Sequence, residues 1–275
     1  MKVLRFLGKH KQFAIFLILA IGIIGVAVFA PWIAPKDPLE AVMTDSLKAP
    51  GGEYPWGTDK LGRDLLSRII YGTRSSLTST LILVSFIFAV GTVLGVIAGY
   101  FGGIADAVIM RIADMMISFP GLILAIAIAG LLGPSLVNAV IAISAVSWTK
   151  YARLARSMVL KVKQSLFIEA AVVNGTRTLD ILRKHILPNM ITTMVVTAAT
   201  DIGTMMLELA SLSFLGFGAT APTPEWGLML NEGRTYIAKA PWLMIYPGIA
   251  IVVVVIVFNM LGDSLRDILD PKQES

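Results

Sequence analysis

Two acidic residues stand inside one of the long apolar runs of this chain, where an ionisable side chain is costly. Asp201 and Glu208 fall within the run Met190–Leu212, and ionisable groups inside a membrane span usually mark a functional path. Their spacing of seven residues is about two helical turns, which predicts both carboxylates on one helix face about 10 Å apart. The pair could face a cation, a metal chelate or a peptide amino terminus. Equally, each carboxylate could meet a basic or hydroxyl partner on another helix.

Soft and nitrogen ligands near this pair are few. Met205 and Met206 lie beside the Asp201–Glu208 face; packing is the favoured role for such methionines, and Met205 is kept as a candidate for lining a path. The two histidines, His10 and His185, do not stand at ligand spacing with another histidine or a carboxylate. The chain contains no cysteine, which excludes disulfides and thiolate ligands. We therefore predict no metal site built by this chain.

A second candidate site lies in a basic segment between two apolar runs. Residues 169–175 are Glu-Ala-Ala-Val-Val-Asn-Gly, and His-Ile-Leu-Pro follows at 185–188. The apolar spacing predicts two short helices, 164–174 and 178–187. Gly175 would supply the positive φ at the end of the first, and Pro188 would close the second. Such a helix pair would project as a knob, either docking into a groove of another protein or anchoring the spans at the membrane surface.

The composition requires a membrane around these sites. Of 275 residues, 56% are hydrophobic and 15% charged, whereas a soluble domain has about 25% charged residues. This excludes an ordinary soluble domain, a disordered chain and a nucleic-acid binder. A hydrocarbon core about 30 Å thick needs about 20 apolar residues of helix. The predicted fold is an all-α polytopic membrane protein with about six transmembrane helices, at Phe13–Ala30, Leu77–Phe101, Ile109–Leu132, Leu136–Trp148 (continuing as a polar helix), Met190–Leu212 and Leu243–Leu261.

Basic residues orient these spans. Four lie at the N-terminus (Lys2, Arg5, Lys9 and Lys11), and eight lie within 150–184, against two acidic residues there. The positive-inside rule places both segments, and with six spans both termini, in the cytoplasm. The predicted division is a tail and first span (1–30), an external loop with a short amphipathic helix at Asp59–Ile70 (31–76), a five-span core (77–262) with a cytoplasmic coupling loop (150–189), and a cytoplasmic tail (263–275).

The spacing E-A-A, three residues, G, nine residues, H-I-L-P resembles the EAA loop of bacterial ABC importer permeases. Four further segments resemble signatures of the dipeptide, oligopeptide and nickel branch: Trp56–Asp59 with Gly62–Asp64, Ser213–Gly218, Pro224–Gly227 and Asn259–Asp267. The resemblance covers nearly the whole chain. It implies the C-type permease subunit of such an importer, with a type I (MetI-like) permease fold in the bacterial inner membrane.

The same resemblance implies what this chain lacks and what its partners supply. No G-x-x-x-x-G-K-[ST] phosphate-binding loop occurs in the chain. The implied subunit is non-catalytic and holds no cofactor, because two partner ATPase subunits or domains bind the ATP. A sister permease subunit, an extracytoplasmic solute-binding protein and membrane lipid are the other implied partners. The residues implied to transmit force from the ATPases are Glu169, Ala170, Ala171, Gly175 and Arg177.

The substrate signals point in two directions. Asp201–Gly203 and Thr220–Thr223 resemble nickel permeases, whereas Arg183–Asn189 and Glu208 fit peptide permeases as well. The prediction is nickel or a metal chelate, with short peptides as the alternative. A secondary transporter or channel using Asp201 and Glu208 is an alternative class, but it would not need the projecting knob. A membrane enzyme is another, although the chain lacks a recognisable catalytic grouping.

Overall fold

The computed structural model describes residues 10–269, and every regular element within that range is a helix. The all-α prediction is therefore confirmed. In chain order the elements are α2 (Lys11–Ile33), η1 (Met43–Asp45), α3 (Leu65–Phe101), α4 (Gly103–Ile117), α5 (Gly121–Leu132), α6 (Leu136–Lys163), α7 (Leu166–Val173), α8 (Thr178–Ile181), the π-helical turn η2 (Leu182–Ile186), α9 (Leu187–Phe214), α10 (Trp226–Gly233), η3 (Arg234–Tyr236) and α11 (Trp242–Leu269).

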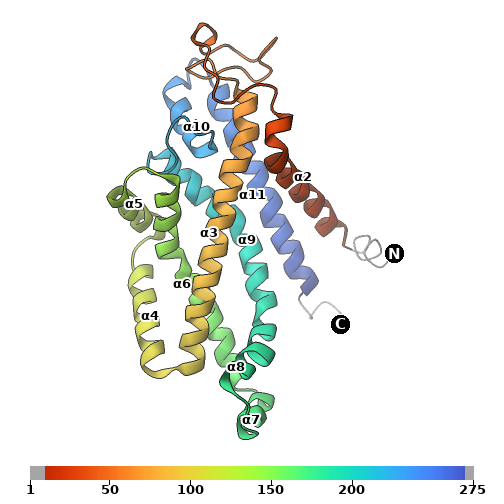
Figure 1. Cartoon of the computed structure of the whole chain (residues 1–275), viewed down its shortest axis with the longest axis vertical. Helices are drawn as coiled ribbons and strands as arrows, with labels where there is room; N and C mark the ends of the chain where they lie inside the picture. The colour runs from red at the N-terminus through yellow and green to blue at the C-terminus, as the bar shows by residue number, and fades with distance from the viewer. Residues whose placement is uncertain (1–9, 270–275) are drawn as a thin grey trace.

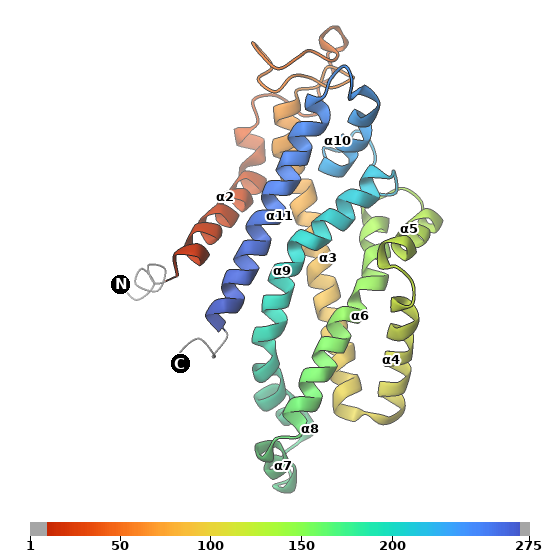
Figure 2. The ribbon, with the colours of Figure 1, turned by 180° about the vertical axis from the view of Figure 1, so that it is seen from behind.

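The long helices form an elongated bundle with two distinct ends. Figure 1 shows the 34–64 segment and α10 at one end, and α7 with α8 at the other. Helices α3, α6, α9 and α11 run between the ends, and both views show α6 beside α3 (Figure 2). The N-terminal end of α2 and the C-terminal end of α11 point away from the 34–64 segment. Both of these helix ends therefore lie on the same side of the bundle as the α7–α8 tip.

The number of membrane spans differs from the prediction. By length and composition, four described helical stretches could each cross a membrane: α2, α3, the stretch 178–214 that ends with α9, and α11. A fifth span is obtained if α4 and α5 count as one. Helix α6 does not qualify, because its second half carries Lys150, Arg153, Arg156, Lys161 and Lys163. Six spans are therefore not supported by apolar length alone, although α6 runs along α3 in the bundle.

The predicted span Ile109–Leu132 is broken in the structure. Helices α4 and α5 meet at an angle of 92° across a break of a few residues. Pro120 stands at this break as the N-cap of α5, and a proline disfavours helical geometry in the residue before it. Helix α4 is also tied to α6 by two ion pairs, which join Asp106 to Arg156 and Asp114 to Arg153.

The segment predicted to be an external loop also differs from its prediction. Asp59–Ile70 does not form a separate amphipathic helix; α3 begins at Leu65 and continues for 37 residues to Phe101. The Asp64 carboxylate caps it by accepting a hydrogen bond of 2.8 Å from the Ser67 amide. A helix of this length extends about 55 Å, well beyond a hydrocarbon core of about 30 Å. Part of α3 therefore extends beyond the hydrocarbon core.

Helices α3 and α6 touch along a seam of glycines. Gly91, Gly95 and Gly99 recur every fourth residue of α3, so they share one face of the helix. A Cβ atom at Gly95 would lie 2.3 Å from the Ala152 carbonyl oxygen, and one at Gly91 would lie 2.5 Å from the Trp148 carbonyl oxygen. The two backbones are therefore in direct contact, as small residues allow between membrane helices.

This seam predicts a large cost for a small added side chain. Gly95→Val should force α3 away from α6 and destabilise the protein by about 1–3 kcal/mol or more, the usual range for an overpacked interior. The measurement is the amount and the thermal stability of the permease in detergent. Gly25→Val in α2 is the control, because nothing lies within 4 Å of a Cβ added there. Equal stability of the two variants would contradict the close packing.

Candidate functional site

The tip of the bundle is built as the predicted knob. Helices α7 and α8 flank a turn in which Gly175 has φ +72°, a conformation that favours glycine. The amide of Thr176 donates to the Ala171 carbonyl oxygen at 3.0 Å, which closes the end of α7. Ile168 and Ile181 are buried and fix the knob to the bundle. The predicted role of Gly175 in ending the first helix is therefore confirmed.

The implied coupling residues lie on the surface of this knob. Glu169, Ala170, Gly175 and Arg177 are exposed and Ala171 is half-buried. Apolar side chains surround them, and the most exposed are Leu166 at 82% and Val173 at 85%. Exposed apolar groups gathered in one place are typical of a contact surface.

The second half of the knob differs from the prediction. Pro188 does not close a helix over 178–187; α8 ends at Ile181, the π turn η2 follows, and α9 starts at Leu187. Pro188 lies in the first turn of α9, where a proline costs no internal hydrogen bond. The knob therefore leads without a loop into the helix that carries Asp201 and Glu208.

The Asp201 carboxylate has partners on α6. Its Oδ1 accepts from the Lys150 ammonium at 2.6 Å, and its Oδ2 accepts from the Tyr151 hydroxyl at 2.8 Å. Asp201 is 4% exposed and Tyr151 is fully buried, whereas 58% of the Lys150 side chain is exposed. The structure thus realises the partner arrangement that the sequence left open for this carboxylate. In the sequence, Lys150 stands out only as one of the orienting charges, and Tyr151 gives no signal because contacts across 50 residues leave no local pattern.

The other residues suggested for a path lie in two environments. Met205 is 5% exposed and packs in the core with Met194 and Leu209, so it does not line an open path in this conformation. Glu208 is half-buried. Within residues 10–269, no three His, Asp or Glu side chains are placed to hold a metal ion together.

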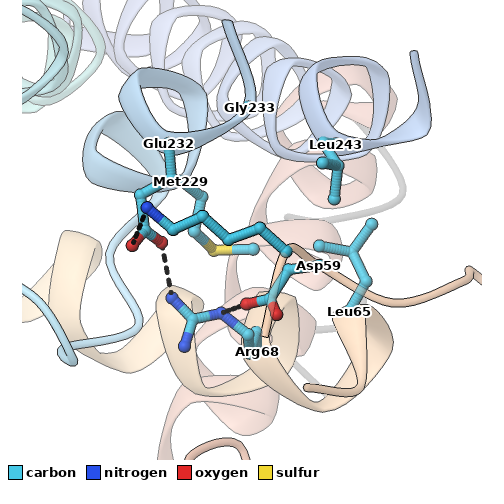
Figure 3. Close-up of a pocket in the computed structure, with 8 residues that line it drawn as sticks. Asp59, Leu65, Arg68, Met229, Glu232, Gly233 and Leu243 are labelled. Atoms are coloured by element: carbon cyan, nitrogen blue, oxygen red, sulfur yellow. Dashed lines mark hydrogen bonds and ion pairs between the residues drawn. The ribbon is translucent and has the colours of Figure 1, made fainter. Parts of the chain in front are cut away.

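A cluster of buried charges around Arg63 and Arg68, which no sequence pattern indicated, lies at the end of the bundle that carries the 34–64 segment and α10. The Arg63 Nε atom is 2.6 Å from Asp59 Oδ2, and a second guanidinium nitrogen is 3.2 Å from Glu232 Oε2. Arg68 also reaches Glu232 Oε2 at 3.2 Å, as Figure 3 shows. Both arginines are 1% exposed. The cavity beside them holds about 10 Å³, space for one water molecule at most, so the cluster clamps the 34–64 segment to α10 instead of binding a ligand.

Two of the four segments that suggested the family meet at this end of the bundle. Asp59 and Arg63 come from the first of them, and the other supplies Glu225 and Trp226 at the start of α10. The buried Glu225 carboxylate caps α10 by accepting from the amides of Gly227 and Leu228 at 3.0 and 2.8 Å. Burial raises the pKa of Glu225, against the lowering effect of these hydrogen bonds.

The comparison with known proteins decides the family. Residues 91–275 match the family described as binding-protein-dependent transport system inner membrane component. The chain belongs to this family. A dipeptide transport system permease protein of Alkalihalophilus pseudofirmus is 45% identical over 269 residues, which cover 98% of this chain and 88% of that protein. A glutathione transport system permease protein of Escherichia coli is 45% identical over 271 residues, with the same coverage.

A solved structure confirms the fold class. The inward-facing MetNI methionine ABC transporter superposes with a TM-score of 0.59 at 21% identity, covering 74% of this chain and 96% of the other. The MetI-like fold is therefore confirmed, and this permease is a subunit of an ABC importer. Membership sets aside the secondary transporter, channel and membrane enzyme. The peptide alternative gains support from these relatives, whereas nickel gains none specifically.

Proposed function

We propose that this permease forms half of the translocation path for short peptides in a bacterial inner membrane, with a sister permease subunit as the other half. The observation that carries the proposal is the 45% identity to a dipeptide permease over 98% of the chain. The family description, binding-protein-dependent transport, supports delivery of the peptide by an extracytoplasmic solute-binding protein.

The knob would be the docking surface for one of two partner ATPase subunits, which bind and hydrolyse the ATP. Its exposed apolar side chains support a contact with protein, and Arg177, Arg183 and Lys184 could meet acidic partner residues or lipid headgroups. This end of the bundle is the cytoplasmic one in the proposal, because basic residues gather there. The N-terminal basic residues Lys2, Arg5 and Lys9 lie outside the described residues.

Force would pass from the knob directly into the membrane. Glu169, Ala170, Ala171, Gly175 and Arg177 form or border the contact surface, and the two alanines keep it narrow. Since α8, η2 and α9 follow one another without a loop, a displacement of the knob on ATP binding would move α9. Asp201 and Glu208 move with it, and the path changes from inward-facing to outward-facing.

Uptake by the complete complex tests the proposal. Proteoliposomes holding both permeases and the ATPases, with the binding protein outside, would receive a radiolabelled dipeptide and, separately, radiolabelled nickel. We expect ATP-dependent dipeptide uptake that excess nickel does not inhibit. Nickel uptake that dipeptides do not inhibit would overturn the peptide assignment while leaving the importer intact. Uptake that continues without ATP would overturn the coupling to ATPases.

A further inference from the structure

Glu208 is a half-buried carboxyl group on α9, six residues before that helix ends at Phe214. No hydrogen bond or ion pair of 4.0 Å or less joins it to another residue within 10–269, although it lies within electrostatic range of Asp201 and Lys150. When all three groups are ionised, one negative charge is left uncompensated. Since a lone charge facing lipid is costly, an ionised Glu208 needs a water-filled space or a cation from outside this chain.

We propose that Glu208 receives the free α-ammonium group of the transported peptide and that Lys150 receives its terminal carboxylate. The path would then select short peptides in which both termini are free. This inference rests on the proposed function, and it assigns the group that each side chain would recognise.

The carboxylates of α9 differ in what they can still bind. Both oxygens of Asp201 are occupied, one by Lys150 and one by Tyr151, and Asp201 is buried. Glu208 is half-buried and keeps both oxygens for a ligand. Glu208, and not Asp201, is therefore the group available to an incoming ammonium.

Lys150 can serve two acceptors at once. An ammonium group has three N–H donors, and the contact with Asp201 uses one of them. Because 58% of the side chain is exposed, the remaining donors can reach a second carboxylate. The contact with Asp201 already restricts the Lys150 amine. Lys150 would therefore lose less conformational freedom when it binds a peptide carboxylate.

The spacing of these positions along α9 is on the scale of a short peptide. Asp201, which holds the Lys150 amine, and Glu208 are about 10 Å apart along the helix axis. A dipeptide extends about 7 Å, and a charge-assisted hydrogen bond of about 2.8 Å at each end brings the reach to about 12–13 Å. The exposed Thr204 lies between them on α9 and could bond to the peptide backbone. None of these contacts depends on the peptide side chains.

Ligand-observed NMR on the complete complex tests this assignment without the binding protein, whose own selectivity would otherwise intervene. Saturation transfer to alanyl-phenylalanine would be compared with transfer to its N-acetylated and C-terminally amidated forms, on the complex in nanodiscs. We expect the wild type to bind the free dipeptide about tenfold more tightly than either blocked form, the size typical of a hydrogen bond between charged groups.

Two variants test the recognition of the two peptide termini separately. Glu208→Gln should abolish the preference over the N-acetylated form and keep the preference over the amide. The double variant Lys150→Met/Asp201→Asn should abolish the preference over the amide and keep the preference over the N-acetylated form. It removes the amine without leaving Asp201 buried as an unpaired charge. Arg153→Met is the matched control, since Arg153 is three residues from Lys150 but pairs with Asp114 of α4; both preferences should remain.

Equal binding of free and blocked peptides by the wild type, no transfer to the free dipeptide, or unchanged preferences in Glu208→Gln would overturn the inference. ATP-dependent dipeptide uptake by the same wild-type complex distinguishes the two levels. If uptake is present while the preferences do not move, this inference is wrong and the peptide importer stands. If no peptide is taken up, the proposed function itself fails.

Discussion

A permease carrying Ala170→Trp is expected to insert and assemble normally but to transport at roughly a tenth of the wild-type rate or less. Ala170 is exposed on α7, so the indole meets no part of this chain and the fold should tolerate it. In the proposed complex the same indole would be forced into the ATPase groove. Overpacking costs about 1–3 kcal/mol, and each 1.4 kcal/mol is about tenfold in the docking equilibrium.

The measurement is ATP-dependent uptake beside the amount of ATPase that co-purifies with the permease. Val28→Trp places the same side chain on an exposed position of α2 and should leave both quantities unchanged. If Ala170→Trp retains full uptake and full ATPase binding, the knob is not the docking surface.

Removal of one buried charge from the cluster around Arg63 and Arg68 should have the largest effect on stability. Arg68→Met leaves Asp59 and Glu232 facing only Arg63 within the buried part of the cluster, and breaking such a pair costs about 3–5 kcal/mol. For a chain of this size we expect the unfolding midpoint to fall by about 10 °C. Thermal unfolding of the purified permease measures the change.

Charge balance provides the control for this effect. Arg68→Met/Glu232→Gln removes one charge of each sign and should recover part of the lost stability. Lys184→Ala breaks an exposed ion pair with Asp180 and should leave the midpoint unchanged, since exposed pairs contribute little. A single variant as stable as the double variant would show that the buried charges are not coupled.

The parts of the fold that follow from local chemistry could be predicted from sequence. The long apolar runs correspond to α2, α9 and α11 because burial in lipid is a property of each segment alone. Gly175 was predicted to turn the chain because its role depends on its own backbone. The bend at Pro120 was missed, although the proline is visible, since an apolar run on either side also fits a single span.

The parts that depend on distant contacts could not be predicted. Lys150 and Asp201 are 51 residues apart, and Arg63 and Glu232 are 169 apart. Each residue has a plausible role by itself, as an orienting charge or a surface charge. Only the packing of α6 against α9, and of the 34–64 segment against α10, shows that these charges are buried together.

The glycine seam between α3 and α6 has a mechanical consequence. Two packed helices normally slide past each other when the side chains between them change rotamer. Here the backbones of α3 and α6 are in direct contact at Gly91 and Gly95. Shear along this contact would break its close fit at every step, so α3 and α6 should move as one lever. The pivot of any alternating movement must then fall elsewhere. The α6–α9 contact that contains Lys150 and Asp201 is where this rigid pair meets α9, the helix that the knob would move in the proposed function.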